Sequence, residues 1–173
     1  RTTSRDRGYL ELVATLGPVY VRTIAAALAR IDSEKPAGQK LDGNYKTYKL
    51  PKKSGGNRTV SVPTPVLKKV QRGILYSILN PLGSHEASFG FVKGLSIRDN
   101  AQRHVGQEVV VNCDVSNCFP SVTWSLVLGA IRRDLGKHLS PAAISIIVDI
   151  CTAHGGLPIG APTSPLLLNR VLL

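Results

Sequence analysis

A single acidic residue follows an apolar stretch in the second half of the chain. Residues 109–111 are three valines, and Asp114 comes after Asn112 and Cys113. Because β-branched residues favour buried strands, this segment predicts a strand that ends close to Asp114. Burial of an unpartnered carboxylate is costly, and a divalent cation is one partner that would compensate. A solvated Asp114 in a surface turn is the alternative, and this stretch alone leaves both interpretations open.

Basic residues are concentrated ahead of this segment. The chain has 173 residues and a formal net charge of +11. Residues 35–72 hold ten Lys or Arg against one acid, Asp42, whereas residues 104–173 hold four of each. This segregation indicates a phosphate-contacting surface beside a packed body, and therefore a nucleic-acid partner. A basic face that only aids solubility is the alternative.

The elements that must position these residues are of mixed type. Apolar residues at helical spacing predict helices over 6–16, 18–31, 65–79, 123–135, 141–151 and 166–173, with a short helix around 97–104. In the helix over 123–135, Leu126, Val127, Ala130 and Ile131 are expected to face inward. Two β-rich runs on either side of 54–57 predict an antiparallel hairpin over 45–63. The fold class is therefore α+β, with 109–115 as a further strand.

The predicted hairpin turn is a candidate phosphate site. Lys52, Lys53 and Arg58 lie close to the turn on opposite strands. Lysine supplies a point charge to a phosphate, and arginine a bidentate fork. Two Gly-containing loops follow in the sequence, over 88–97 with Lys93 and over 155–165. A charged turn that is merely solvated is the alternative for the hairpin.

The cysteines and the hydropathy of the sequence indicate the cellular compartment. The three cysteines, Cys113, Cys118 and Cys151, are odd in number and form no Cys-x-x-Cys pair. This pattern favours a reducing compartment over a disulfide framework. No signal peptide opens the sequence and no apolar run reaches membrane-spanning length, so we expect a cytoplasmic protein without a membrane partner.

Four separated pieces, taken in order, resemble bacterial reverse transcriptases. They are the basic hairpin over 50–58, the loop over 90–97, the Asp114 segment with Phe119-Pro120-Ser121, and the Gly-Ala-Pro-Thr-Ser-Pro run over 160–165. The resemblance implies part of a right-hand polymerase. An N-terminal helical segment would occupy 1–44, fingers with the basic hairpin 45–108, and a partial palm 109–173.

A fifth piece narrows the resemblance. The run Asn100-Ala101-Gln102-Arg103-His104 is similar to the Asn-Ala-x-x-His signature of retron reverse transcriptases. The implied function is an RNA-directed DNA polymerase that acts in phage defence. Its implied partners are a structured RNA template and primer, the DNA product, dNTPs and an effector protein. The alternatives are a group II intron-type or abortive-infection reverse transcriptase, or an RNA-binding polymerase remnant without chemistry.

The resemblance also implies roles at the Asp114 segment. Asp114 would ligate two Mg²⁺ ions, and the backbone carbonyl of Val115 would be a further ligand. Two such ions clamp the attacking and leaving oxygens of a phosphoryl transfer, which requires hard oxygen donors. The incoming triphosphate would rest on the backbone of Ser116, Asn117 and Cys118.

Further roles are implied outside that segment. Phe119 would stack under the sugar and exclude a 2′-hydroxyl, and Lys53 and Arg58 would close on the triphosphate. Gly160 would belong to the platform beneath the nucleotide. The other implied nucleic-acid contacts are Lys52, Lys68, Lys69, Arg72, Lys93, Asn100, His104, Ala161 and Pro162.

Some positions depart from the family pattern. The family usually has an acid where Asn117 stands and Gln where Ile159 stands. The run Ser88-Phe89-Gly90-Phe91 replaces the more usual His-Gly-Phe. The sequence also stops at Leu173, before the paired aspartates and thumb of the family. Asp134 and Asp149 lie in predicted helices and are poor substitutes. We therefore expect that residues 1–173 alone do not polymerise.

The hypothesis makes a definite structural demand. Asp114 should lie near Lys53, Arg58 and Phe119, and an Asp114 that points into solvent far from all three would overturn the polymerase interpretation.

Overall fold

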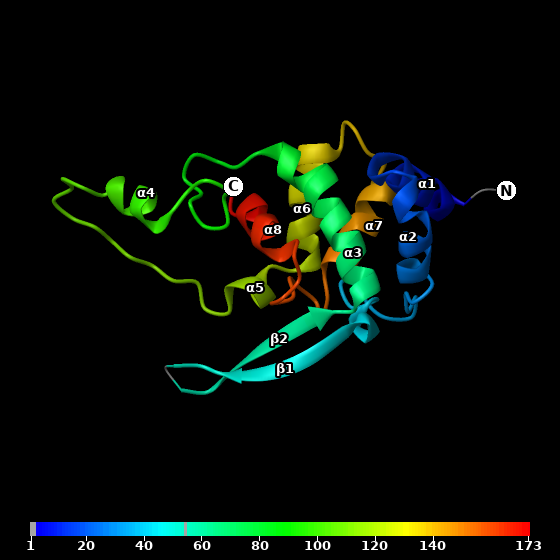
Figure 1. Cartoon of the computed structure of the whole chain (residues 1–173), viewed down its shortest axis with the longest axis horizontal. Helices are drawn as coiled ribbons and strands as arrows, with labels where there is room; N and C mark the ends of the chain where they lie inside the picture. Colours follow the sequence, from blue (N-terminus) through cyan, green and yellow to red (C-terminus); the bar gives the residue numbers. More distant parts are fainter. Residues whose placement is uncertain (1–2, 54) are drawn as a thin grey trace.

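A helical body carries two projections, a β-hairpin and a long arm (Figure 1). The structure is a computed structural model that describes residues 3–53 and 55–173. The two projections extend from the same side of the body (Figure 1). The body consists of α1 (Ser4–Leu16), α2 (Val21–Leu28), α3 (Pro65–Ile74), α6 (Trp124–Leu135), α7 (Pro141–Cys151) and α8 (Ser164–Val171).

Local capping sets where several helices begin. Thr3 caps α1, because its hydroxyl accepts from the backbone N–H of Asp6 and its own N–H donates to the Asp6 carboxylate. Ser140 caps α7 just before Pro141, and its hydroxyl accepts from the Ala143 N–H at 3.2 Å. The Ser140 N–H donates to Glu11 of α1 at 2.9 Å. The start of α7 is therefore tied to α1.

The core lies around α7, which packs against α1, α3 and α6. Val127, Ala130 and Ile131 of α6 are buried, as predicted, and the apolar faces of the other helices bury Leu12, Leu16, Ile24, Leu67, Val70, Ile74, Ile144, Ile147 and Cys151. Leu126 was expected to face inward and instead is 50% exposed, because it lies at the edge of the buried stripe of α6. Among the described residues, no helix is long and apolar enough to cross a lipid bilayer.

A buried glutamine joins the hairpin to two helices. Gln71 of α3 donates from Nε2 to the Tyr45 hydroxyl at 2.7 Å and to the Ile150 carbonyl of α7 at 2.9 Å. Burial raises the pKa of Tyr45 well above its usual value, so the phenol stays protonated. The first residue of the hairpin is thereby fixed to the core.

Replacement of Gln71 by Leu should lower the free energy of unfolding by about 2–4 kcal/mol, because it leaves the Ile150 carbonyl and the Tyr45 hydroxyl buried without this partner. Urea denaturation monitored by circular dichroism measures the change. Tyr45→Phe removes only one of the two bonds and should cost about 1 kcal/mol. A Gln71→Leu variant as stable as the wild type would contradict this account of the junction.

The predicted hairpin is confirmed. Strands β1 (Tyr45–Pro51) and β2 (Asn57–Pro63) pair antiparallel, from Tyr45 opposite Pro63 to Pro51 opposite Asn57. The Lys52 N–H donates to the Gly56 carbonyl at 3.0 Å and closes the loop. Ser54 of the predicted turn lies outside the described residues.

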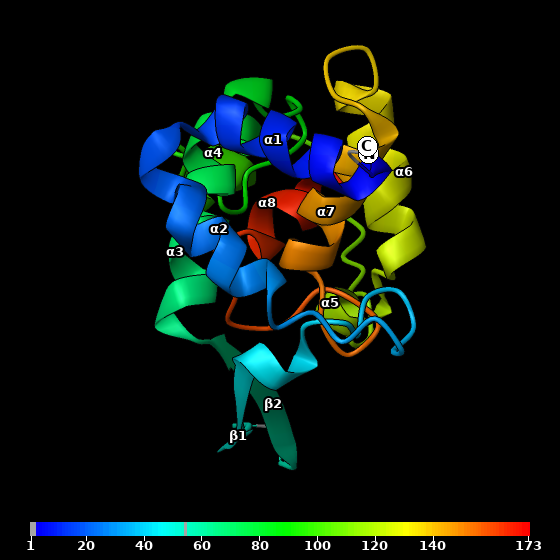
Figure 2. The same ribbon diagram turned by 90° about the vertical axis from the view of Figure 1, so that its right-hand side faces the viewer.

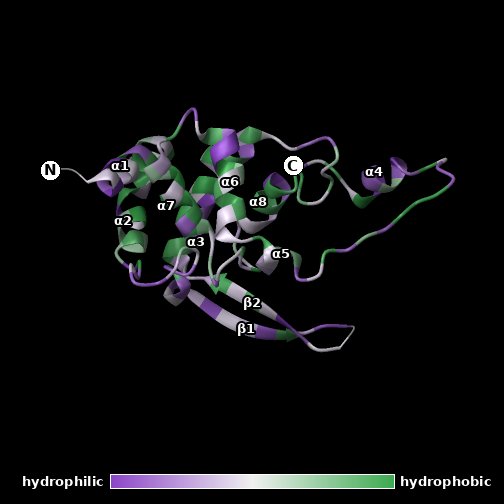
Figure 3. Cartoon of the chain, turned by 180° about the vertical axis from the view of Figure 1, so that it is seen from behind, coloured by the Kyte–Doolittle hydropathy of each residue, from purple (hydrophilic) through white to green (hydrophobic). Residues whose placement is uncertain are grey.

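The predicted strand at 109–115 does not form. After the π-helical turn η3 (Leu75–Leu79) and η4 (Asn80–Leu82), the chain enters the arm, which carries α4 (Ile97–Gln102) and returns to α5 (Cys118–Ser121). Val109 and Val111 on the returning segment are 76% and 79% exposed. This segment is coloured largely hydrophobic in Figure 3. A strand needs a hydrogen-bonded neighbour, and the described residues form one sheet, which contains β1 and β2 alone.

The three thiols differ in burial, and their reactivity should follow. Burial raises the pKa of Cys151 to about 12, whereas Cys113 on the arm is exposed and Cys118 is half-buried. Since the thiolate is the nucleophile, iodoacetamide at pH 8 should alkylate Cys113 first and leave Cys151 unmodified until the protein unfolds. Mass spectrometry of timed digests measures the order. Early modification of Cys151 in the folded protein would contradict the packing of α7.

Candidate nucleotide and nucleic-acid site

The loop between α7 and α8 receives two segments that are distant in sequence. The Ser61 N–H of β2 donates to the Ile159 carbonyl at 2.7 Å. The Leu157 N–H donates to the Val122 carbonyl, just after α5, at 3.1 Å. The basic hairpin and the segment that follows Asp114 are therefore anchored to one loop, which lies beside α5 and above the hairpin in Figure 2.

Two glycines allow the loop between α7 and α8 to contact β2 and α5 closely. Gly160 has a φ of +115°, and a Cβ on it would lie 2.9 Å from the Ser61 carbonyl oxygen. A Cβ on Gly156 would lie 2.5 Å from the Pro120 carbonyl oxygen. Both distances are shorter than a van der Waals contact, so the loop meets β2 and α5 closely only because these residues lack side chains. The sequence singled out Gly160 for nucleotide binding, whereas the structure shows its contact with the hairpin.

Other residues of the Gly-Ala-Pro-Thr-Ser-Pro run face the core. Ala161 is 4% exposed, so its predicted contact with nucleic acid is wrong for the side chain, which packs in the hydrophobic cluster. Pro162 is half-buried. Ser164 is buried and donates its hydroxyl to the Pro158 carbonyl at 2.7 Å. This bond holds the loop closed ahead of α8.

Asp114 lies in solvent. Its side chain is exposed, as is that of Val115, and within the described residues it has no hydrogen bond or ion pair, including with Lys53 or Arg58. The expectation of a buried carboxylate is therefore wrong, because the segment that carries it has no strand beside it. The solvated turn that the sequence left open is what the structure shows.

The chain reverses direction immediately after this exposed segment. Asn117 is in the left-handed region, with φ +49° and ψ +39°, directly before α5. Asparagine tolerates this conformation better than most residues, which accounts for Asn at this position. Ser116 is exposed, and Cys118 is half-buried against the core. The turn thus leads from Asp114 to the anchored helix within a few residues.

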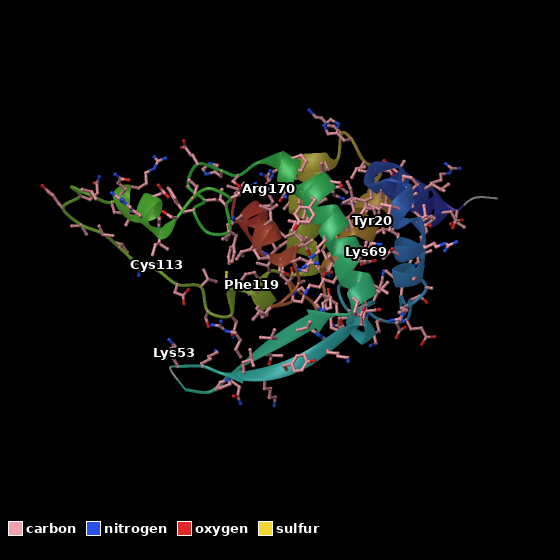
Figure 4. The ribbon with its side chains drawn as sticks, viewed as in Figure 1. Tyr20, Lys53, Lys69, Cys113, Phe119 and Arg170 are labelled. Atoms are coloured by element: carbon pink, nitrogen blue, oxygen red, sulfur yellow. The ribbon has the colours of Figure 1, made fainter. Side chains whose placement is uncertain are left out.

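Phe119 of α5 contacts the loop over 88–97. Its ring centre lies 6.3 Å from that of Phe91, with the ring planes at 75°. That loop is also held to α8, since Asn169 Nδ2 donates to the Gly90 carbonyl at 2.8 Å. Figure 4 shows Phe119 at the root of the arm that carries Cys113, with Lys53 on the nearby hairpin. Contacts thus join Phe119 to the loop over 88–97, while β2 and the chain after α5 meet the loop between α7 and α8.

The hairpin cations are exposed and lack carboxylate partners. Lys52 and Lys53 lie at the turn and Arg58 follows in β2, opposite Leu50. In the described part of the chain none of the three forms an ion pair. Their charge is therefore available to a phosphate ligand.

The residues of the Asn-Ala-x-x-His run lie on the arm. Asn100 and His104 line a pocket of about 260 Å³ together with Glu86, Phe89 and Arg103. The Arg103 guanidinium lies 5.8 Å from the centre of the Phe89 ring, within cation–π range. Lys93 in the preceding loop is exposed.

The oxygen donors for a metal ion are few but of the right type. Asp134 binds Arg133 and Arg170 at 2.9 and 2.8 Å, and Asp149 binds the Trp124 indole N–H at 2.8 Å, so both are engaged within the fold. Within 3–53 and 55–173, no three His, Cys, Asp or Glu side chains gather as metal ligands. The Asp114 carboxylate and the Val115 carbonyl are hard oxygen donors. They fit Mg²⁺, which takes one or two carboxylates together with substrate phosphates.

Comparison with known proteins defines the class. The family described as reverse transcriptase (RNA-dependent DNA polymerase) matches residues 50–173, so the chain belongs to the reverse transcriptase family. It is 34% identical over 145 residues to the Retron Mx162 reverse transcriptase of Myxococcus xanthus. The matched region covers 75% of this chain and 30% of that relative. It is 36% identical over 132 residues to the Retron Ec86 reverse transcriptase of Escherichia coli. That match covers 75% of this chain and 40% of the relative.

The chain is thus similar to bacterial retron reverse transcriptases. A third, the Retron Mx65 reverse transcriptase of Myxococcus xanthus, is 36% identical over 148 residues, with 75% of this chain and 34% of the relative covered. The chain spans less than half the length of each of these relatives.

Proposed function

We propose that the protein is an RNA-directed DNA polymerase of the retron type, which copies a structured RNA into DNA by two-metal phosphoryl transfer and acts in phage defence. The observation that carries the proposal is the shared anchorage of two motifs. The basic hairpin, through Ser61, and the chain just after α5, through Val122, are both hydrogen-bonded to the loop that contains Ile159 and Gly160. A nucleotide bound there would meet cations, an aromatic ring and oxygen donors from separate parts of the chain.

In this proposal Asp114 and the Val115 carbonyl hold Mg²⁺ against the substrate phosphates. The ions would supply charge neutralisation and alignment for in-line displacement. The left-handed Asn117 followed by helical Cys118 supports a backbone site for the triphosphate, because successive N–H groups in such a turn form an anion-binding nest. Phe119 stacks beneath the sugar, while Lys53 and Arg58 bind the phosphates from the hairpin.

The partners follow from this chemistry. The template and primer are structured RNA, the substrates are dNTPs, and the product is DNA. An effector protein and a cytoplasmic setting complete the proposal, the latter supported by three free cysteines among the described residues.

The hairpin cations test the nucleotide assignment. In the protein at its natural full length, Lys53→Gln combined with Arg58→Gln should raise KM for dNTP at least about tenfold, because each cation donates charge-assisted hydrogen bonds to phosphate. Steady-state incorporation on a fixed RNA template measures KM. Lys49→Gln neutralises an exposed lysine on β1 away from the turn and should leave KM within about twofold. An unchanged KM in the double variant would mean that the hairpin cations do not bind the dNTP.

A second function is favoured by one observation. Asp114 is exposed and has no partner among the described residues, as expected if the segment has no catalytic role. The basic hairpin would then hold RNA without copying it. The Asp114 variants described below separate this candidate from the polymerase.

A further inference from the structure

A pocket of about 690 Å³ opens where the base of the hairpin meets α3. It adjoins η1 (Pro18–Tyr20), and in Figure 4 the labelled Tyr20 and Lys69 lie toward α2 and α3, whereas Cys113 and Phe119 lie toward the arm. The pocket is therefore separate from the Asp114 segment. Its lining contains four cations, two tyrosines and the residue that precedes α3, namely Lys46, Lys68, Lys69, Arg72, Tyr20, Tyr76 and Thr64.

The pocket is strongly positive. No acidic residue lines it, and within the described residues none of its four cations forms an ion pair. Thr64 stands at the N-cap of α3 but makes no side-chain cap, and its buried hydroxyl oxygen has no hydrogen-bond partner among the described residues. The uncapped helix start adds positive potential to that of the lysines and the arginine. Such a pocket favours an anion with several charges.

The tyrosines add faces for stacking. Gly73 of α3 allows the Tyr20 ring to lie directly on the helix, because a Cβ at Gly73 would come within 2.7 Å of that ring. Tyr76 on η3 is 63% exposed. Aromatic faces interleaved with cations bind unpaired nucleic acid, with bases stacked and phosphates neutralised. The volume lies within the range of small-ligand pockets, about 300–1,000 Å³, and cannot enclose a duplex.

We infer that this pocket binds an unpaired segment of RNA, and thereby holds the template at a second place, apart from the segment that carries Asp114. The phosphates contact Lys46, Lys68, Lys69 and Arg72, and the bases stack on Tyr20 and Tyr76. That the strand is RNA rests on the proposed function. The binding itself requires neither Mg²⁺ nor a dNTP, which makes it separable from synthesis.

The test measures binding to a fluorescein-labelled, unstructured RNA of about 12 nucleotides by fluorescence anisotropy, in EDTA and across a salt series. The slope of log K against log salt should fall in magnitude by about 3 when all four pocket cations become Gln, since each single-strand phosphate contact contributes about 0.7. A control with Arg7, Arg30, Arg132 and Lys137 changed to Gln removes four exposed cations elsewhere. Its slope should change by less than about 1.

Stacking is tested separately at an exposed position where folding is not at risk. Tyr76→Ala should weaken RNA binding at least about fivefold, and Tyr76→Phe should keep the affinity within about twofold, because the ring and not the hydroxyl stacks. If the fourfold variant fails to fold, the comparison of Tyr76→Ala with Tyr76→Phe still tests whether the pocket binds RNA.

Three results would overturn the inference. One is an unchanged salt slope in the fourfold variant. The second is equal affinity for Tyr76→Ala and Tyr76→Phe. The third is tighter binding of DNA of the same sequence, or of an acidic peptide, either of which would assign the pocket to another partner. Asp114→Asn should bind this RNA like the wild type, so failure of the polymerase proposal would appear in synthesis and not in this assay.

Discussion

Asp114→Asn should abolish RNA-templated DNA synthesis by the protein at its natural full length, with a fall in kcat of about 1,000-fold or more. The substitution replaces the carboxylate of the proposed metal ligand by a neutral amide at nearly constant shape, and metal-based charge stabilisation is worth several kcal/mol of transition-state energy. Because the side chain is exposed and has no partner among the described residues, the fold and the affinity for RNA should be unchanged. Primer-extension rates and RNA-binding isotherms measured side by side give both quantities.

The chain offers a matched control on the same segment. Glu108 is another exposed carboxylate of the arm, and Glu108→Gln makes the same chemical change without touching the proposed ligand. Its synthesis rate should stay within about twofold of the wild type. If Asp114→Asn were equally active, Asp114 would not anchor a metal ion. Intact RNA binding without any wild-type synthesis would instead favour the non-catalytic RNA-binding candidate.

Gly160→Ala should destabilise the protein by about 2–4 kcal/mol and release the hairpin from the loop. Two costs add. The residue has a φ of +115°, which side-chain-bearing residues rarely adopt, and its Cβ would lie 2.9 Å from the Ser61 carbonyl oxygen. Relief of that overlap requires β2 to move, which would break the 2.7 Å bond from the Ser61 N–H to the Ile159 carbonyl. Urea unfolding gives the stability, and amide hydrogen exchange at Ser61 reports the bond.

Gly129→Ala serves as the control for this substitution. Gly129 is exposed in α6, and a Cβ there meets nothing within 4 Å. It should be neutral or stabilising by up to about 1 kcal/mol, because alanine is the better helix former. Equal stability of Gly160→Ala and wild type, with Ser61 still protected, would mean that the loop and hairpin are not locked together by this glycine. Gly160 would then be left with the nucleotide role that the sequence assigned to it.

Local signals in the sequence predicted the helices and the hairpin. Helix 141–151 follows from Ser140-Pro141 and an apolar stripe, and the hairpin follows from Gly55-Gly56 between β-rich runs. Capping, helical periodicity and turn chemistry act over a few residues, so they can be read without knowledge of the fold. Leu126 shows the limit of periodicity, since it lies at the edge of the apolar stripe and is exposed, whereas Val127 beside it is buried.

Long-range contacts could not be predicted in this way. The valines at 109–111 have strand propensity, but whether they pair depends on a neighbouring strand, which the described residues do not provide. The contact of Gly160 with Ser61 joins residues about a hundred positions apart, and the sequence showed only a glycine in a proline-rich loop. The same is true of Tyr20, Lys46 and Tyr76, which come together in one pocket only because η1, the start of the hairpin and η3 meet.

The central claim is that a metal ion binds at Asp114 beside the loop that anchors the hairpin. Iron-mediated cleavage tests it most directly, with Fe²⁺ and peroxide in place of Mg²⁺ in the ternary complex of protein, RNA template–primer and dNTP. Radicals formed at the bound ion should cut the backbone at 113–116 and around 158–161, and the cuts should disappear with excess Mg²⁺ or in Asp114→Asn. Cuts confined to other segments, or cuts at 113–116 that persist in Asp114→Asn, would contradict the claim.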